Sequence, residues 1–294
     1  MFSLASFLIT LREAIEAALI VGILLIYVTK IGEKKLKKQV WIGTIAGIVL
    51  SILTAVIFQF ALGGFESYEE IFEGFAMIIA SLLLTWMIIW MLKTGKDVQK
   101  KLEEKVDISI KQQQKYGLLT LALISVLREG VETVLFLAGI GATEDNPWIV
   151  LWSGLLGIVV ALVIAFLIFY SGKKINLQSF FLITSIVLII VAAGMFSHGI
   201  HEFQEIGWFG SETHWLQKQV WDMSGILNDK TNELGKFLRA LFGYQDKPTW
   251  LEIIAYIGYY LILGLITIAS FLLKKKKSKN NFQSNKTFRR EEKT

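Results

Sequence analysis

Residues 11–16 read Leu-Arg-Glu-Ala-Ile-Glu, and residues 127–132 read Leu-Arg-Glu-Gly-Val-Glu. Each stretch stands inside a long apolar run, where it places three charged side chains in a segment otherwise suited to lipid. A charged side chain at the centre of a bilayer costs about 2.5–3.5 kcal/mol on insertion scales. Charges placed at such a cost, in two matching groups, indicate a functional site.

The chain around these stretches predicts an all-α polytopic membrane protein. Of its 294 residues, 54% are hydrophobic and only 19% are charged, whereas soluble domains carry about 25% charged residues. An apolar run longer than about 18 residues can cross a bilayer as a helix, which satisfies its own backbone hydrogen bonds. Seven runs predict transmembrane helices: Leu4–Thr29, Val40–Leu62, Ile71–Leu92, Tyr116–Ile140, Trp148–Tyr170, Phe180–Ser197 and Leu251–Leu273.

The basic residues predict the orientation of these helices. Lys and Arg gather in cytoplasmic loops. One alternating set of connections, together with the C-terminal tail, carries 23 of them, and the other set carries five. We therefore expect the N-terminus outside and the C-terminus in the cytoplasm. The same distribution explains the net charge of +5 without nucleic-acid binding.

Four regions follow from this topology. Residues 1–197 form a six-helix transport core, 198–249 an extracytoplasmic segment, 250–273 a seventh transmembrane helix and 274–294 a basic cytoplasmic tail. The extracytoplasmic segment predicts two short amphipathic helices at the membrane surface. Their apolar faces are Trp215, Leu216, Val220 and Trp221 in the first, and Leu234, Phe237, Leu238 and Leu241 in the second.

The two charged stretches also define an internal repeat. They match as Leu-Arg-Glu-x-x-Glu with an offset of 116 residues, so helices one to three correspond to helices four to six. Because three helices is an odd number, the second copy enters the membrane inverted, and transporters with inverted repeats bind substrate near the midplane. At 1.5 Å per residue, Arg12 would lie level with Glu132, and Glu16 level with Arg128. We expect two ion pairs that cross between the motifs.

The chemistry of the motifs favours a cation. Glutamates spaced i, i+3 share one helix face, and the two motifs together hold four carboxylates and two guanidiniums, a formal charge of −2. Oxygen donors suit hard cations. The chain has no cysteine, which excludes disulfides, thiolate metal sites and iron–sulfur clusters. The structural alternative is a set of buried ion pairs that only joins helices.

A second polar group follows the sixth apolar run. His198, His201, Glu202 and Glu205 recur at i, i+3, i+4 and i+7, so they share one helix face at the outer end. Glu73, at the outer start of the third helix, is their counterpart in the repeat. These five residues predict an outer metal relay site. The alternatives are a helix end wetted by water or, less favoured, a haem site on the two histidines.

The paired motifs, on the first and fourth of seven helices, resemble those of the oxidase-dependent iron permease family, the iron/lead permeases. The resemblance covers roughly residues 1–273. It implies a plasma-membrane permease, not an enzyme, that imports ferric iron as its substrate and has no permanently bound cofactor. It also implies a partner outside that oxidises or donates iron. The residues it assigns to iron are Glu13, Glu16, Glu129 and Glu132, supported by Arg12 and Arg128.

Other functions stay open on the sequence alone. Similar carboxylates would serve a transporter or proton-coupled exchanger for another cation, such as ferrous iron, lead or manganese. The outer histidines leave room for a membrane oxidoreductase, and the buried motifs for a purely structural subunit.

Overall fold

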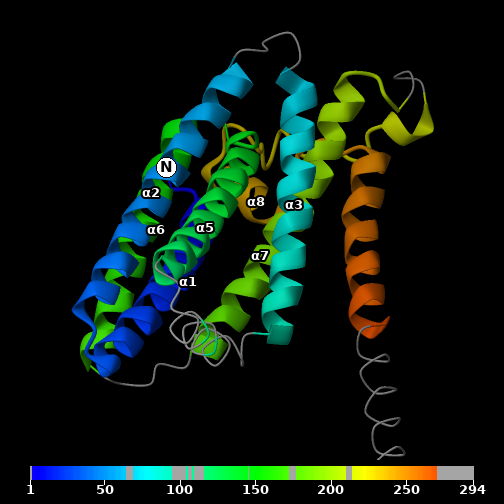
Figure 1. Cartoon of the computed structure of the whole chain (residues 1–294). Coiled ribbons are helices and arrows are strands. Elements are labelled where there is room, and N and C mark those ends of the chain that lie inside the picture. The colour runs from blue at the N-terminus through cyan, green and yellow to red at the C-terminus, as the bar shows by residue number, and fades with distance from the viewer. Residues whose placement is uncertain are drawn as a thin grey trace, which may run out of the picture.

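The structure is a computed structural model that describes residues 2–63, 69–94, 104, 108, 116–144, 146–171, 177–209 and 214–269. Within these ranges the regular secondary structure is helical, apart from one isolated β-bridge between Gln219 and Thr249. The elements are α1 (Leu4–Ile31), α2 (Lys34–Gly63), α3 (Glu69–Thr94), α5 (Gly117–Gly141), α6 (Pro147–Ser171), α7 (Leu177–Glu205), η3 (Trp215–Gln217) and α8 (Glu233–Phe242). A C-terminal helix follows over Trp250–Ala269 (Figure 1).

Six of the predicted spans are confirmed as helices long and apolar enough to cross a membrane. They are α1, Lys35–Phe60 of α2, Glu70–Met91 of α3, Pro147–Phe169 of α6, Phe180–Glu205 of α7 and the C-terminal helix. The remaining candidate, α5, has 25 residues. Its three charges at Arg128, Glu129 and Glu132 keep its composition from identifying it as a membrane span, so this span stays a prediction. The predicted tail 274–294 lies outside the described residues.

Helices α2 and α6 each pack along a motif-bearing helix, α2 on α5 and α6 on α1. Glycine makes both approaches possible. A Cβ atom at Gly47 of α2 would lie 2.9 Å from Val126 Cβ, and one at Gly157 of α6 would lie 2.6 Å from the Phe7 carbonyl oxygen. The faces of α2 and α6 that point away from these partners carry exposed apolar side chains. Apolar side chains are what a helix needs where it contacts lipid.

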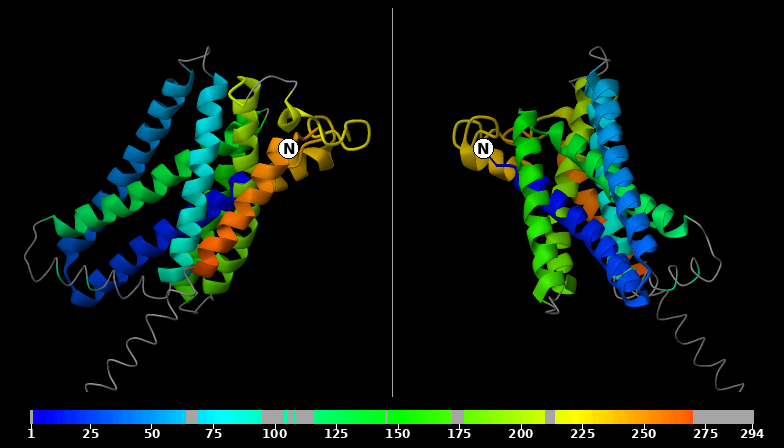
Figure 2. Two further views of the ribbon diagram at one scale, coloured as in Figure 1. Left: turned by 90° about the vertical axis from the view of Figure 1, so that its right-hand side faces the viewer. Right: turned by 60° about the vertical axis from the view of Figure 1, so that its left-hand side comes forward.

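A second layer consists of α3 and α7, which pack side by side. Ser81 Oγ of α3 donates a 2.6 Å hydrogen bond to the Ala192 carbonyl of α7. Helices α1 and α5 also contact each other, and Figure 2 shows them running together, inclined to α3 and α7. The largest buried apolar cluster joins the layers; it includes Ile9, Leu84, Phe136 and Leu188.

The segment 198–249 agrees with its prediction in part. Helix α7 continues to Glu205, which confirms the helical spacing expected of His198, His201, Glu202 and Glu205. The first predicted amphipathic helix is wrong, since only the short turn η3 forms there. The physical reason is backbone pairing: Val220 N donates to the Pro248 carbonyl and Met223 N to the Asp246 carbonyl, both at 2.9 Å, which keeps this stretch extended.

The second predicted amphipathic helix is present as α8. Asn232 caps its N-terminus by accepting from the Leu234 and Gly235 amides, and Gly243 ends it in the left-handed conformation, with φ 64°. Gly243 also touches α7, because a Cβ atom at Gly194 would lie 2.7 Å from the Gly243 Cα and N atoms. This backbone contact places α8 directly against the C-terminal half of α7 (Figures 1 and 2).

Candidate metal site

The first motif is buried in the middle of α1. Arg12 has no exposed surface and Glu13 is 1% exposed. Arg12 Nη1 donates to Glu13 Oε1 at 3.3 Å, and Arg12 Nη2 lies 3.1 Å from Glu16 Oε1. The i, i+4 spacing explains the second contact, since it puts arginine one turn from glutamate on the same face.

The second motif repeats this arrangement on α5. Arg128 Nε donates to Glu132 Oε1 at 2.9 Å and lies 4.0 Å from Glu129 Oε1. The surroundings differ, because 39% of the Arg128 side chain is exposed, whereas Arg12 is completely enclosed. The two motifs therefore share their local geometry and differ in how much of the arginine side chain is exposed.

The predicted ion pairs between the motifs are wrong. Arg12 pairs with Glu13 and Glu16 of its own helix, and Arg128 with the glutamates of α5. A guanidinium four residues before a glutamate reaches it without crossing to a neighbouring helix. The motif side chains that meet between α1 and α5 are the carboxylates.

Carboxylates from both motifs gather at one point. Glu13, Glu16 and Glu129 each place one oxygen within 4.8 Å of the others, and within the described ranges this is the one such group of histidine and acidic side chains. Glu132 is not a member, although its charge acts on both Glu13 and Glu16. The Oε2 atoms of Glu13 and Glu132 are buried without a hydrogen-bond partner. The carboxylate oxygens of Glu13, Glu16 and Glu129, held this close together, can ligate a cation.

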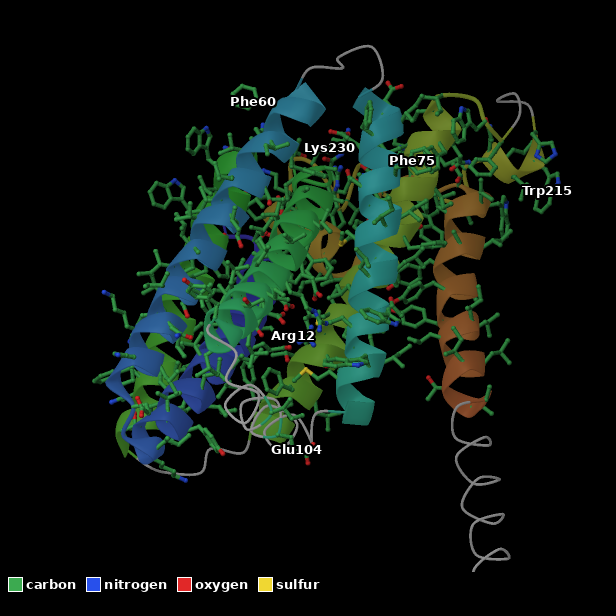
Figure 3. The ribbon with its side chains drawn as sticks, viewed as in Figure 1. Arg12, Phe60, Phe75, Glu104, Trp215 and Lys230 are labelled. Carbon is green, nitrogen blue, oxygen red and sulfur yellow. The ribbon has the colours of Figure 1, made fainter. Side chains whose placement is uncertain are left out.

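A third helix completes the surroundings of the arginines. Trp90 and Met91 of α3 contact Arg128 and Arg12 respectively, and Arg12 is seen between α5 and α3 in Figure 3. Sequence reasoning missed both residues because neither belongs to a recognisable motif. An aromatic residue and a methionine near the end of an apolar run are ordinary, and only the fold shows what they touch.

The predicted outer relay residues are divided among different partners. Both ring nitrogens of His198 contact residues in or just after α8: Nε2 lies 3.3 Å from Arg239 Nη2 and Nδ1 lies 3.0 Å from Gln245 Nε2. His201 contacts Glu252 of the C-terminal helix through Nδ1 and Glu205 through Nε2, the latter at 3.2 Å.

The carboxylates of this set are more loosely placed. Glu202 lies 4.0 Å from His198, and Glu73 of α3 acts on Glu202 through its charge. The five residues form no three-ligand group. A relay role for them stays a prediction.

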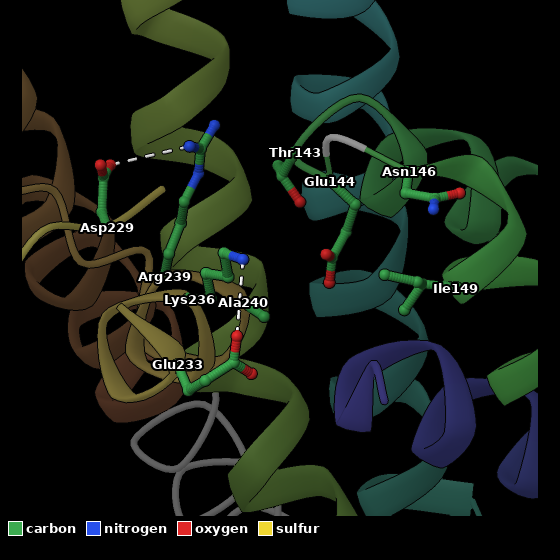
Figure 4. Close-up of a pocket in the computed structure, with 9 residues that line it drawn as sticks. All are labelled: Thr143, Glu144, Asn146, Ile149, Asp229, Glu233, Lys236, Arg239 and Ala240. Carbon is green, nitrogen blue, oxygen red and sulfur yellow. Dashed lines mark ion pairs between the residues drawn. The ribbon is translucent and has the colours of Figure 1, made fainter. Parts of the chain in front are cut away.

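A polar cavity of about 300 Å³ opens between α8 and the α5–α6 connection (Figure 4). Two ion pairs line its α8 side, Asp229 with Arg239 at 3.7 Å and Lys236 with Glu233 at 3.6 Å. Burial raises the pKa of the Asp229 carboxyl, and the Arg239 charge opposes that change. Across the cavity stand Thr143, Glu144 and Asn146.

The fold and the cluster together define a class, a multi-pass integral membrane protein with acidic side chains in its interior. Comparison with known sequences specifies the family: residues 3–280 match the iron permease FTR1 family, and the chain belongs to it.

Its relatives include the protein named ferrous iron permease EfeU in Escherichia coli O6:H1, which is 34% identical over 88% of this chain and 93% of the relative. The proteins of that name in Escherichia coli O157:H7 and Yersinia pestis are 34% and 33% identical, over 90% and 88% of this chain and 94% and 91% of their own length. No solved structure shows a significant match.

Proposed function

We propose that this chain is an iron permease of the plasma membrane that imports iron through the carboxylate cluster between α1 and α5. One observation carries the proposal. In a member of an iron permease family, two Arg-Glu-x-x-Glu motifs from separate helices bring three carboxylate oxygens within 4.8 Å of one another. A pair of ion bridges that only joined helices would cross from one to the other, whereas here each arginine stays on its own helix.

The electrostatics of the cluster suit a multivalent cation. The two motifs together hold four carboxylates and two guanidiniums, a formal charge of −2. This charge attracts a cation, and the guanidiniums partly neutralise the carboxylates while the site is empty. The membrane potential drives inward movement by about 2.3 kcal/mol per charge per 100 mV, so a trivalent ion gains roughly 7 kcal/mol. The potential can therefore drive import without a nucleotide site.

Ferric iron is the proposed substrate, because the side chains that meet in the cluster offer only hard oxygen donors. Ferrous iron is the second candidate, and the relatives favour it by their name, ferrous iron permease. Iron is substrate here, and no permanently bound cofactor is proposed. An extracytoplasmic protein that oxidises or donates iron is the proposed partner beside the lipid bilayer.

An inverted repeat is the proposed architecture of the core. The pairing of helices supports it: the second helix of each half, α2 or α6, packs on the first helix of the other half. The first helices α1 and α5 contact each other, and so do the third helices α3 and α7. A two-fold exchange of the halves preserves this pattern. Helix α5 is about 37 Å long, enough to cross a hydrocarbon core of about 30 Å, so we propose it as the seventh span.

Uptake of radioactive iron into proteoliposomes tests the function. Ferric and ferrous iron would be supplied separately to the wild-type protein and to a Glu13→Gln, Glu129→Gln double variant. We expect the double variant to lose at least tenfold in the initial rate, since each amide removes a negative charge while keeping the size of the side chain. Glu233→Gln, at an exposed ion pair of α8, is the matched control.

The two ions separate the two candidate substrates. Uptake of the ferric ion alone supports the first, and uptake of the ferrous ion alone supports the second. A double variant with wild-type uptake would rule out the cluster as the path, and a wild type that moves neither ion would contradict the permease function.

A further inference from the structure

Two consecutive residues of α3 contact the arginines of both motifs. Arg12 Nη2 donates a hydrogen bond to Met91 Sδ at 3.2 Å. Arg128 Cζ lies 5.1 Å from the centroid of the Trp90 ring, within the range of a cation–π interaction. One turn of a third helix thus touches the positive groups of two motifs that belong to α1 and α5.

Both of these partners are electrically neutral. A thioether sulfur is a weak hydrogen-bond acceptor, and an aromatic face attracts a cation through its quadrupole. Trp90 and Met91 therefore orient the guanidiniums and leave the net charge of the cluster unchanged. An acidic residue at either position would make the cluster more negative and would compete for the guanidinium.

A cation entering the cluster competes with the arginines for the same oxygen atoms. Glu16 Oε1 lies 3.1 Å from Arg12 Nη2, the nitrogen that also contacts Met91. Glu132 Oε1 accepts from Arg128 Nε while the guanidinium faces Trp90. Once a carboxylate turns to the cation, its arginine loses a partner, and an unpartnered charge in the interior is costly.

We propose that Trp90 and Met91 are positioning residues, which hold the guanidiniums of Arg128 and Arg12 while the motif glutamates bind the transported cation. This inference rests on the proposed function. It assigns to α3 a part in setting the affinity of the site, although α3 supplies no ligand to it.

Substitution of Trp90 tests the inference. Initial rates of iron uptake into proteoliposomes would be measured against iron concentration for Trp90→Leu and Trp90→Phe. For Trp90→Leu we expect the half-saturating concentration to rise roughly tenfold, as loss of a partly desolvated cation–π contact implies, with a maximal rate within about twofold of wild type. Trp90→Phe keeps an aromatic face and should recover most of the affinity.

The same helix offers matched controls. Trp86 lies one turn earlier on α3 and is 57% exposed, so Trp86→Leu should leave the half-saturating concentration unchanged. Met87 packs in the main apolar cluster, so Met87→Leu controls for Met91→Leu. Because a thioether is the weaker partner, we expect Met91→Leu to raise the half-saturating concentration about threefold.

A binding measurement separates positioning from packing. Iron should raise the melting temperature of the wild type by mass action, and Trp90→Leu should reduce that rise. In an Arg128→Gln background, Trp90→Leu should have no further effect, since the guanidinium it positions is gone.

Two results would overturn the inference alone: equal affinities in Trp90→Leu and Trp86→Leu, or an undiminished effect of Trp90→Leu without Arg128. A wild type that neither binds nor moves iron would overturn the proposed function and this inference together.

Discussion

Arg12 and Arg128 occupy equivalent positions in their motifs, and their surroundings make them unequal. Arg12 is fully enclosed and serves two carboxylates, Glu13 and Glu16. Arg128 serves Glu132 from a side chain that is 39% exposed. Arg12 has two carboxylates within 3.3 Å, whereas Arg128 has only one within that distance, because Glu129 lies 4.0 Å away.

Neutralising each arginine should therefore destabilise the protein to different extents. For Arg12→Gln we expect a loss of about 3–5 kcal/mol, because buried carboxylates lose their counter-charge. For Arg128→Gln we expect a smaller loss of about 1–3 kcal/mol, because Glu132 loses one hydrogen bond. Thermal unfolding of the two purified variants in one detergent checks the order, and an equal or larger loss in Arg128→Gln would contradict it.

The sequence was sufficient to find the motif residues, because a charge in an apolar run is visible without a fold. It could not tell how far α1 and α5 are rotated about their own axes. The prediction of crossed pairs was wrong because each arginine reaches the glutamate four residues further along its own helix. Trp90 acquires its role only from the approach of α3 to α5, which no local pattern encodes.

At the scale of elements, glycine determines how closely the helix pairs approach. Gly47 of α2 faces Val126 of α5, and Gly157 of α6 faces the backbone of α1. The apolar runs predicted these helices within six residues at each end. It could not predict their partners, since all faces of a lipid-exposed helix are apolar. The extended stretch after η3 was missed because its hydrogen bonds go to residues 246–248, far along the chain.

Enlarging Gly47 should separate α2 from α5. For Gly47→Val we expect a fall of several degrees in melting temperature together with reduced iron uptake, since the added atoms meet Val126 and the Leu123 carbonyl. Gly264→Val in the C-terminal helix is the control, because a Cβ atom there meets nothing within 4 Å. Equal melting temperatures for Gly47→Val and Gly264→Val would show that stability does not require close packing at Gly47.

One end of the molecule carries α8 and the polar cavity beside it. The loop charges predict that this end is extracytoplasmic and that the opposite end is cytoplasmic. The cavity between α8 and the α5–α6 connection lies at the outer end of this topology. The prediction that this end is extracytoplasmic rests only on the Lys and Arg residues of the loops. The packing of the helices would be the same in either orientation, so it does not test the prediction.

Single cysteines test the orientation cleanly, because the chain has none of its own. Asn146→Cys, at the start of α6, should react with a membrane-impermeant maleimide in intact cells. Glu33→Cys, between α1 and α2, should react only after the membrane is permeabilised. Labelling in the reverse order would invert the proposed topology.

The contact between Gly194 of α7 and Gly243 after α8 has a consequence for how the sequence can vary. The two backbones touch with no room for a side chain on either, and Gly243 also adopts a left-handed conformation. A chain that gained a side chain at one position would have to lift α8 from the bundle. Substitutions at 194 and 243 should therefore be tolerated only in relatives that do not pack α8 against α7. The residues at these two positions thus predict whether a homologue has the same α8–α7 contact.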